Sequence, residues 1–179
     1  MLPIGTEAPN FELWDSVSSS TKTLNQIKGF HGTLVMFICN HCPFVIHINE
    51  ALIKIANSLK NKGIGVVAIS SNDIKDYPQD GPEQMQIHAK NTNYNFPYLY
   101  DETQSVAKAY DAACTPDFFL FDSKLKLVYR GQLDDSRPGN GLPVNGNDLL
   151  RAVQCMTENK TNTKPQKPSI GCNIKWKTS

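Results

Sequence analysis

The stretch from Thr33 to Val45 reads TLVMFICNHCPFV, and its pattern changes halfway along. Residues 33–38 are nearly all apolar over the length of one strand, which is typical of a strand buried on both faces of a sheet. From residue 43 to about residue 62, apolar side chains recur at steps of three and four, which predicts a helix with one buried face. A buried strand therefore leads into a helix, and Cys39 and Cys42 lie at the junction.

A second buried strand follows this helix, because residues 65–70 read GVVAIS. The order of strand, helix and strand allows a right-handed crossover between parallel strands, so we predict the α/β class. Two hairpins are predicted, one within residues 8–32 and one of residues 118–121 and 125–129. Helices are predicted at about 82–93 and 147–158, and a short strand at 96–100. A further helix is predicted after this strand, opened by a capping box of Asp101 and Gln104.

Length and composition exclude several classes of protein. A chain of 179 residues fits one domain of ordinary size. With 18 Lys and Arg against 17 Asp and Glu the net charge is +1, so we expect no nucleic-acid partner. The first residues lack the pattern of a secretory signal, and the longest apolar run is far too short to span a bilayer. We therefore expect a cytoplasmic protein with no membrane partner.

The composition shifts near the C-terminal end. Residues 159–167 are rich in Asn, Thr, Lys, Gln and Pro, which is typical of a linker and does not build a core. We therefore predict a domain of residues 1–158, followed by a linker and tail of residues 159–179. The tail regains apolar side chains and carries Cys172, which leaves open whether it returns to the domain.

The five cysteines are an odd number, which argues against a scaffold of paired disulfides. Cys39 and Cys42 have the C-x-x-C spacing of a redox pair, and a helix N-terminus favours the thiolate form of the first cysteine. Cys42 would then resolve a mixed disulfide on Cys39, while His41 adds positive charge or a hydrogen bond. Two other interpretations stay open, a buried pair without function and half of a zinc site.

Three further motifs resemble those of a known group. Residues 5–11 read GTEAPNF and resemble the G-x-x-A-P-x-F opening of redoxins, and FPYLYD at 96–101 followed by VAKAY at 106–110 resembles the second half of their domain. CTPDFFLFD at 114–122 is similar to their strand with a cis-proline. The chain thus resembles the redoxin (AhpC/TSA-like) group of the thioredoxin-like superfamily. Its CNHCPFV run and PSIGC ending also resemble bacterial thioredoxin-family proteins of poorly defined function.

The resemblance implies a fold and a substrate-binding loop. The expected fold is a central mixed β-sheet flanked by helices, with an N-terminal hairpin and a redoxin-type insertion of one helix and one strand. Pro116 would be the cis-proline and face the first cysteine. A cis X-Pro bond leaves the preceding backbone free to pair with an extended segment, so Thr115 would position a substrate. Cys114 would lie close to the active site.

The departures from the resembling groups limit the function. Ile38 stands where thioredoxins have a tryptophan before the first cysteine. Counting back from Cys42, peroxiredoxins would have a threonine at Cys39 and a proline at Val35, so their peroxidase mechanism is disfavoured. His41, as the second residue between the cysteines, resembles disulfide isomerases and disulfide-forming oxidases, which implies a less reducing pair.

We therefore predict a thiol–disulfide oxidoreductase that needs no cofactor and no metal. Its partners would be protein thiols or disulfides, or small thiols or peroxides. One alternative is an antioxidant peroxide reductase that works through a sulfenic acid. Another is binding or delivery of a metal by Cys39, His41 and Cys42, completed by Cys172. Cys172 is either an additional redox thiol or a bystander, and Cys155 is expected in the core.

Overall fold

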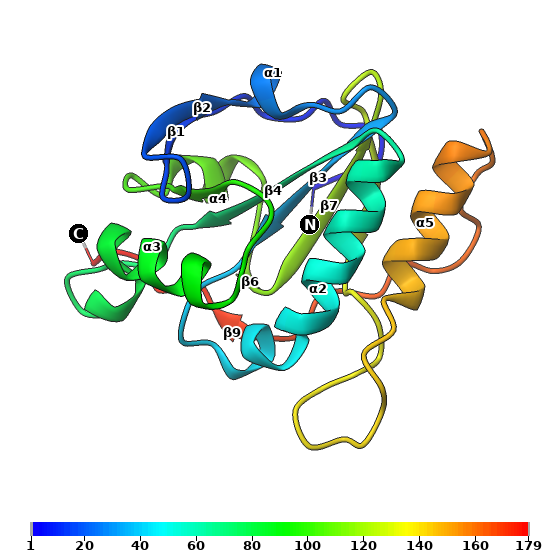
Figure 1. Cartoon of the computed structure of the whole chain (residues 1–179). Helices are drawn as coiled ribbons and strands as arrows, with labels where there is room; N and C mark the ends of the chain where they lie inside the picture. The colour runs from blue at the N-terminus through cyan, green and yellow to red at the C-terminus, as the bar shows by residue number, and fades with distance from the viewer. Residues whose placement is uncertain (1, 179) are drawn as a thin grey trace.

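Strand β3 (Gly32–Phe37) lies inside the main sheet, and all of its residues are buried. The computed structural model describes residues 2–178, and within that range the sheet has seven strands in the order β2-β1-β5-β4-β3-β7-β8 (Figure 1). β3 pairs in parallel with β4 and antiparallel with β7. The other strands are β1 (Glu12–Asp15), β2 (Ser20–Thr23), β4 (Ile64–Ser70), β5 (Tyr98–Tyr100), β6 (Cys114–Thr115), β7 (Asp117–Asp122), β8 (Leu127–Gly131) and β9 (Cys172–Asn173).

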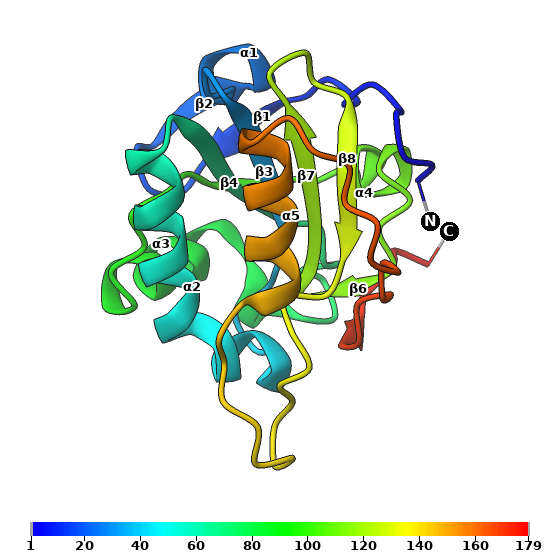
Figure 2. The same ribbon diagram turned by 90° about the vertical axis from the view of Figure 1, so that its right-hand side faces the viewer.

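Helices cover both faces of this sheet (Figures 1 and 2). Leu34 and Met36 of β3 pack with α2, α3 and α5 on one face. Val35 and Phe37 pack with α1 and α4 on the other face, as the alternation of side chains along a strand requires. The helices are α1 (Leu24–Ile27), α2 (Pro43–Asn61), α3 (Pro82–Asn91), α4 (Ser105–Ala109) and α5 (Asn147–Thr157), with a short 3-10 helix η1 (Pro78–Asp80) before α3.

The predicted α/β class is confirmed. β3, α2 and β4 form the expected parallel crossover, because the register pairs Thr33 with Gly65 and Phe37 with Ile69. The expected hairpin near the N-terminus is β1 with β2, and the later hairpin is β7 with β8. A helix and a strand, α3 and β5, follow β4 as expected, and β5 joins the sheet beside it.

The predicted capping box before α4 is wrong. Gln104 is itself the residue before the helix, with a positive φ of 62°. Its side-chain amide donates to the backbone oxygens of Ser71 and Lys175, at 2.7 and 2.8 Å, and does not turn back to Asp101. The Asp101 carboxylate instead accepts from the backbone N–H of Ala107 at 2.9 Å. Contacts distant in the sequence therefore replace the local motif.

The C-terminal tail returns to the domain. Its strand β9 pairs antiparallel with β6 in a second, two-stranded sheet, with Thr115 opposite Cys172. Ile174 is only 3% exposed and belongs to the apolar cluster on the α4 face. The division of the chain at residue 158 stays a prediction.

Within residues 2–178, no helix combines the length and the apolar character that a bilayer crossing requires.

Candidate active site

Cys39 and Cys42 lie in the loop between the end of β3 and the start of α2. α2 begins at Pro43, which suits the first helical position because proline lacks an N–H that would be unpaired there. Cys42 is therefore the N-cap residue, and Cys39 lies three residues before it. Both side chains are buried, with 1% of Cys39 and none of Cys42 exposed.

Thr115 contacts both sulfur atoms from the other side of the site. The bond between Thr115 and Pro116 is cis, as the resemblance implies. The Thr115 hydroxyl lies 3.5 Å from Sγ of Cys39, and the thiol of Cys42 donates to the Thr115 carbonyl oxygen at 3.2 Å. The structure thus brings together residues that are more than 70 positions apart in the sequence.

Cys172 and Cys114 belong to the same cluster of thiols. Cys172 lies opposite Thr115 in the register of β6 and β9 and packs against the apolar cluster that contains Cys39 and Cys42. Cys114 is the first residue of β6 and is buried. Cys155 lies apart on α5 and is half-buried, so its expected place in the core is only partly realised.

The contacts around the pair favour a thiolate at Cys42. The pKa of Cys42 is lowered, first by the hydrogen bond from the Cys39 thiol and then by those from Cys172 and Thr115, although burial opposes this. The pKa of Cys39 is raised, because the same hydrogen bond holds its proton, because the thiol is buried, and because the Asp80 carboxylate lies nearby. The pair therefore holds one proton between two sulfurs.

The sequence analysis expected the thiolate on Cys39, and that assignment stays a prediction. The neighbours that lower the pKa of Cys42 are Cys39, Cys172 and Thr115, and the last two come from distant parts of the chain.

His41 is held by an acid that the sequence analysis missed. Its Nδ1 lies 2.6 Å from Oδ2 of Asp80, and its ring stacks on Tyr77 with 5.6 Å between centroids. Asp80 is fully buried and also accepts from the backbone N–H of Asn40 and the side-chain amide of Asn72, each at 2.8 Å. The tuning of a thiolate by His41 stays a prediction. No local signal in the sequence connects Asp80 to the cysteines.

One set of side chains could approach a metal ion. The ligand atoms of Cys39, His41 and Asp80 lie within 4.8 Å of one another. This set shares Cys39 and His41 with the predicted metal site. It has the Asp80 carboxylate in place of Cys42 and Cys172. Both oxygens of Asp80 already accept hydrogen bonds from the protein, so a metal would have to displace them. The metal alternative therefore gains little support from the geometry.

A buried carboxyl lies directly after the cis-proline. Burial raises the pKa of Asp117 to about 6, and the Ser169 hydroxyl from the tail donates to its Oδ1 at 2.7 Å. Burial also raises the pKa of Cys114 to about 12, so Cys114 stays protonated at neutral pH. Cys114 is therefore a neighbour of the redox pair that lacks its ready ionisation.

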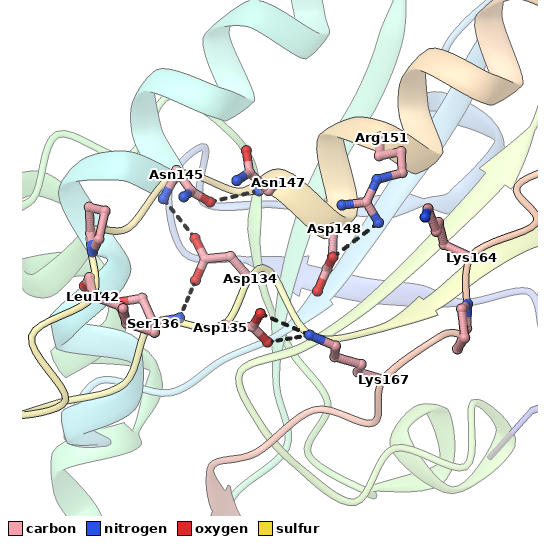
Figure 3. Close-up of a pocket in the computed structure, with 12 residues that line it drawn as sticks. Asp134, Asp135, Ser136, Leu142, Asn145, Asn147, Asp148, Arg151, Lys164 and Lys167 are labelled. Atoms are coloured by element: carbon pink, nitrogen blue, oxygen red, sulfur yellow. Dashed lines mark hydrogen bonds and ion pairs between the residues drawn. The ribbon is translucent and has the colours of Figure 1, made fainter.

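A separate hollow of 520 Å³ lies where the loop after β8 meets α5 and the tail (Figure 3). Two ion pairs lie within the hollow, since Lys167 contacts Asp135 at 2.6 Å and Arg151 contacts Asp148 at 3.2 Å. The Asp134 carboxylate accepts from the backbone N–H of Ser136 and, at the other end of the loop, from those of Asn145 and Gly146. Of the described residues that line this hollow, none is a cysteine.

The mixed sheet and the helices on both of its faces define a thioredoxin-like fold. Residues 4–130 match the AhpC/TSA family, and the chain belongs to that family. No curated protein matches it.

Solved structures extend the likeness to the whole chain. An uncharacterized conserved protein from Geobacillus kaustophilus is 54% identical, with a TM-score of 0.97 over 100% of this chain and 95% of that one. A hypothetical protein from Sinorhizobium meliloti 1021 is 49% identical, with a TM-score of 0.96 over 100% and 97%. The thioredoxin domain of a thiol-disulfide oxidoreductase from Bacteroides vulgatus is 21% identical, with a TM-score of 0.67 over 88% and 99%, which shows a shared fold. The predicted thioredoxin-like fold is confirmed.

The shared proton predicts how the reduced protein titrates. We expect the ultraviolet absorbance of one thiolate to appear below the ordinary thiol pKa, because several donors converge on Cys42. Cys42→Ala should abolish this step, and Cys39→Ala should move it to higher pH because its main donor is lost. Cys155→Ala is the matched control and should leave the step in place. A low-pH step that survives Cys42→Ala would contradict the assignment.

The buried Asp117 predicts a pH-dependent stability. Its folded pKa of about 6 is above the unfolded value of about 3.9, so the native state binds its proton more tightly and loses stability as the pH rises from about 4 through 6. Asp117→Asn removes this loss. We therefore expect the variant to gain stability relative to wild type between pH 4 and pH 8. The difference between the two free energies of unfolding should change by up to about 3 kcal/mol.

Denaturant unfolding of the reduced protein at both pH values measures this difference. The exposed Glu102→Gln is the control and should show little pH-dependent change. An Asp117→Asn effect that is equal at both pH values would show that the carboxyl is not protonated preferentially in the native state.

Proposed function

We propose that the chain is a thiol–disulfide oxidoreductase with Cys39 and Cys42 as its redox pair. The observation that carries the proposal is the burial of both cysteines beside the start of α2, with Thr115 in contact with both sulfurs. A thiolate next to a second thiol can form a mixed disulfide and then be released from it. The proposal needs no cofactor.

In the reducing direction, the Cys42 thiolate attacks one sulfur of a disulfide. A bond forms between Cys42 and that sulfur, and the other substrate sulfur leaves as a thiolate. Cys39 then loses its proton and attacks the Cys42 sulfur, which forms the Cys39–Cys42 disulfide and releases the second substrate thiolate. Two electrons pass from the pair to the substrate. These roles reverse the order that the sequence predicted, because the thiolate is stabilised at Cys42.

The partner of this reaction is a thiol or disulfide compound. We place the reaction in the cytoplasm, with the unpaired cysteine usage of the chain as support. His41 and Asp80 would act as positioning residues, since they fix the backbone N–H of Asn40 between the two cysteines.

Peroxide reduction is a second candidate, favoured by the stabilised thiolate and by the AhpC/TSA family. The Cys42 thiolate would attack one peroxide oxygen, become a sulfenic acid and release the other oxygen as water after protonation. Cys39 would then attack the oxidised sulfur, which forms the disulfide and releases a second water. The same two cysteines would serve both reactions.

Variants of the pair test the proposed function. We expect Cys42→Ser to lower disulfide reduction by more than about a hundredfold, because the attacking sulfur is lost. Cys39→Ser should retain the first attack and accumulate Cys42 in a disulfide that Cys39 can no longer resolve, visible by mass spectrometry. Cys155→Ser is the control with unchanged activity. Turnover by both Cys39→Ser and Cys42→Ser at the wild-type rate would rule out the pair.

Peroxide consumption separates the two candidates. If peroxide reduction is the main activity, reduced wild-type protein should consume hydrogen peroxide much faster than its thiols exchange with a small disulfide, and a sulfenic acid should be trapped on Cys42 in Cys39→Ser. Oxidation by peroxide no faster than that of a free thiol would eliminate this candidate and leave disulfide exchange.

A further inference from the structure

The redox pair has no direct route to an outside substrate in this structure. Cys39 is 1% exposed and Cys42 is not exposed at all. The backbone of Thr115, at which an extended substrate was expected to pair, is already paired with Cys172 of β9. The tail of this chain therefore occupies the place of a substrate peptide.

Several contacts hold the tail there. Ile174 is buried. The next residue, Lys175, is held through both its backbone N–H and its backbone carbonyl oxygen. The N–H of Lys175 donates to Oδ1 of Asn72 at 2.9 Å, and its carbonyl accepts from the N–H of Asp73 at 2.8 Å. The side-chain amide of Gln104 donates to the same carbonyl. Figures 1 and 2 show this C-terminal segment in red at one end of the main sheet.

The approach of the tail to Thr115 requires a glycine. A Cβ atom added to Gly171 would lie 2.0 Å from the Thr115 carbonyl oxygen, which is far inside the contact distance. The same carbonyl oxygen lies 3.2 Å from Sγ of Cys42. Gly171 therefore lets the tail backbone come close enough to place Cys172 against the redox pair.

Cys172 differs from the pair in its exposure. It is half-buried, whereas Cys39 and Cys42 are almost completely enclosed. It packs against the apolar cluster that contains both cysteines, and it lies opposite Thr115, whose carbonyl oxygen contacts the Cys42 sulfur. The cluster therefore holds one partly exposed thiol, Cys172, beside the enclosed pair.

We propose that Cys172 is a third redox thiol, which exchanges disulfide bonds with Cys42 and connects the enclosed pair to small thiol and disulfide compounds. The proposal rests on the proposed function of Cys39 and Cys42 and specifies how a substrate reaches them. Because β9 takes the backbone edge of Thr115, the substrate class is a low-molecular-mass thiol or disulfide and not an extended polypeptide.

The exchange conserves atoms and electrons. The Cys172 sulfur, after losing its proton, attacks Cys42 of the Cys39–Cys42 disulfide. The bond between Cys42 and Cys172 forms as the bond between Cys39 and Cys42 breaks, and Cys39 leaves as a thiolate that takes up the proton. An outside thiolate then attacks the accessible Cys172 sulfur and expels Cys42, whose stabilised thiolate is a good leaving group.

A second outside thiolate completes the cycle. It attacks the outside sulfur of the mixed disulfide on Cys172, which releases an oxidised small disulfide and a Cys172 thiolate. Two electrons have then passed from two small thiols to the original Cys39–Cys42 disulfide. The reverse sequence reduces a small disulfide.

Exchange with glutathione tests the proposal on the full-length chain. We expect oxidised Cys172→Ser to contain the Cys39–Cys42 disulfide but to be reduced by glutathione at least about tenfold more slowly than wild type. Cys155→Ser is the matched control, since it removes a half-buried thiol outside the cluster, and should match wild type. An unchanged rate in Cys172→Ser would overturn the proposal and leave the redox pair intact.

The intermediate is tested separately. Reduced Cys39→Ser treated with oxidised glutathione should form a Cys42–Cys172 disulfide, seen as a joined peptide in non-reducing mass spectrometry. A stable glutathione adduct on Cys42 with Cys172 free would overturn the proposal. If wild type itself forms no Cys39–Cys42 disulfide, the proposed function fails instead, so the two failures are distinguishable.

Gly171→Ala keeps every sulfur but removes the close approach to Thr115. We expect it to form the Cys39–Cys42 disulfide without the Cys42–Cys172 disulfide and to lose the rapid exchange with glutathione as Cys172→Ser does. A circular dichroism spectrum equal to that of wild type confirms that the domain is folded. Rapid exchange in folded Gly171→Ala would show that the docked tail is not needed and would overturn the proposal.

Discussion

Thr115 connects every part of the site. Its hydroxyl contacts Cys39, its carbonyl oxygen contacts Cys42, and its backbone pairs with the strand that carries Cys172. β6 brings Thr115 to this position just before β7, which pairs with β3, the strand that leads to the cysteines. One residue thus aligns three sulfurs from two distant segments. A change in its backbone would alter all of these contacts together.

Burial gives these contacts their effect on the chemistry. Hydrogen bonds are stronger where water is excluded, and a buried thiolate without donors would be costly. The thiol and hydroxyl groups near Cys42 lower its pKa, whereas Cys42 itself, burial and the nearby Asp80 carboxylate raise the pKa of Cys39. A thiolate on Cys42 would be both the better attacking group at neutral pH and the better leaving group.

The sequence predicted the fold where the signal was local. The apolar run of β3 and the periodic face of α2 were visible directly, and the cis bond before Pro116 followed from a resemblance. The start of α2 at Pro43 was visible as well. The assignment of the thiolate to Cys39 stays a prediction, because groups that act on the two sulfurs come from distant segments.

Contacts between distant segments could not be predicted from the sequence. Asp80 reaches His41 from a turn nearly 40 residues later, and Gln104 gives up its expected capping role to bind the tail. The linker-like composition of residues 159–167 concealed the return of Cys172 to the site. These contacts depend on the folded arrangement of loops, for which spacing and periodicity carry no signal.

The central claim is that Cys42 is the shared sulfur of two alternative disulfides. Disulfide mapping of the wild-type chain, equilibrated with glutathione buffers of increasing oxidising strength, tests it most directly. The account predicts Cys39–Cys42 and Cys42–Cys172 linkages in exchange, with Cys114 and Cys155 remaining as thiols. A disulfide between Cys39 and Cys172, or one that includes Cys114 or Cys155 in place of Cys42, would contradict it.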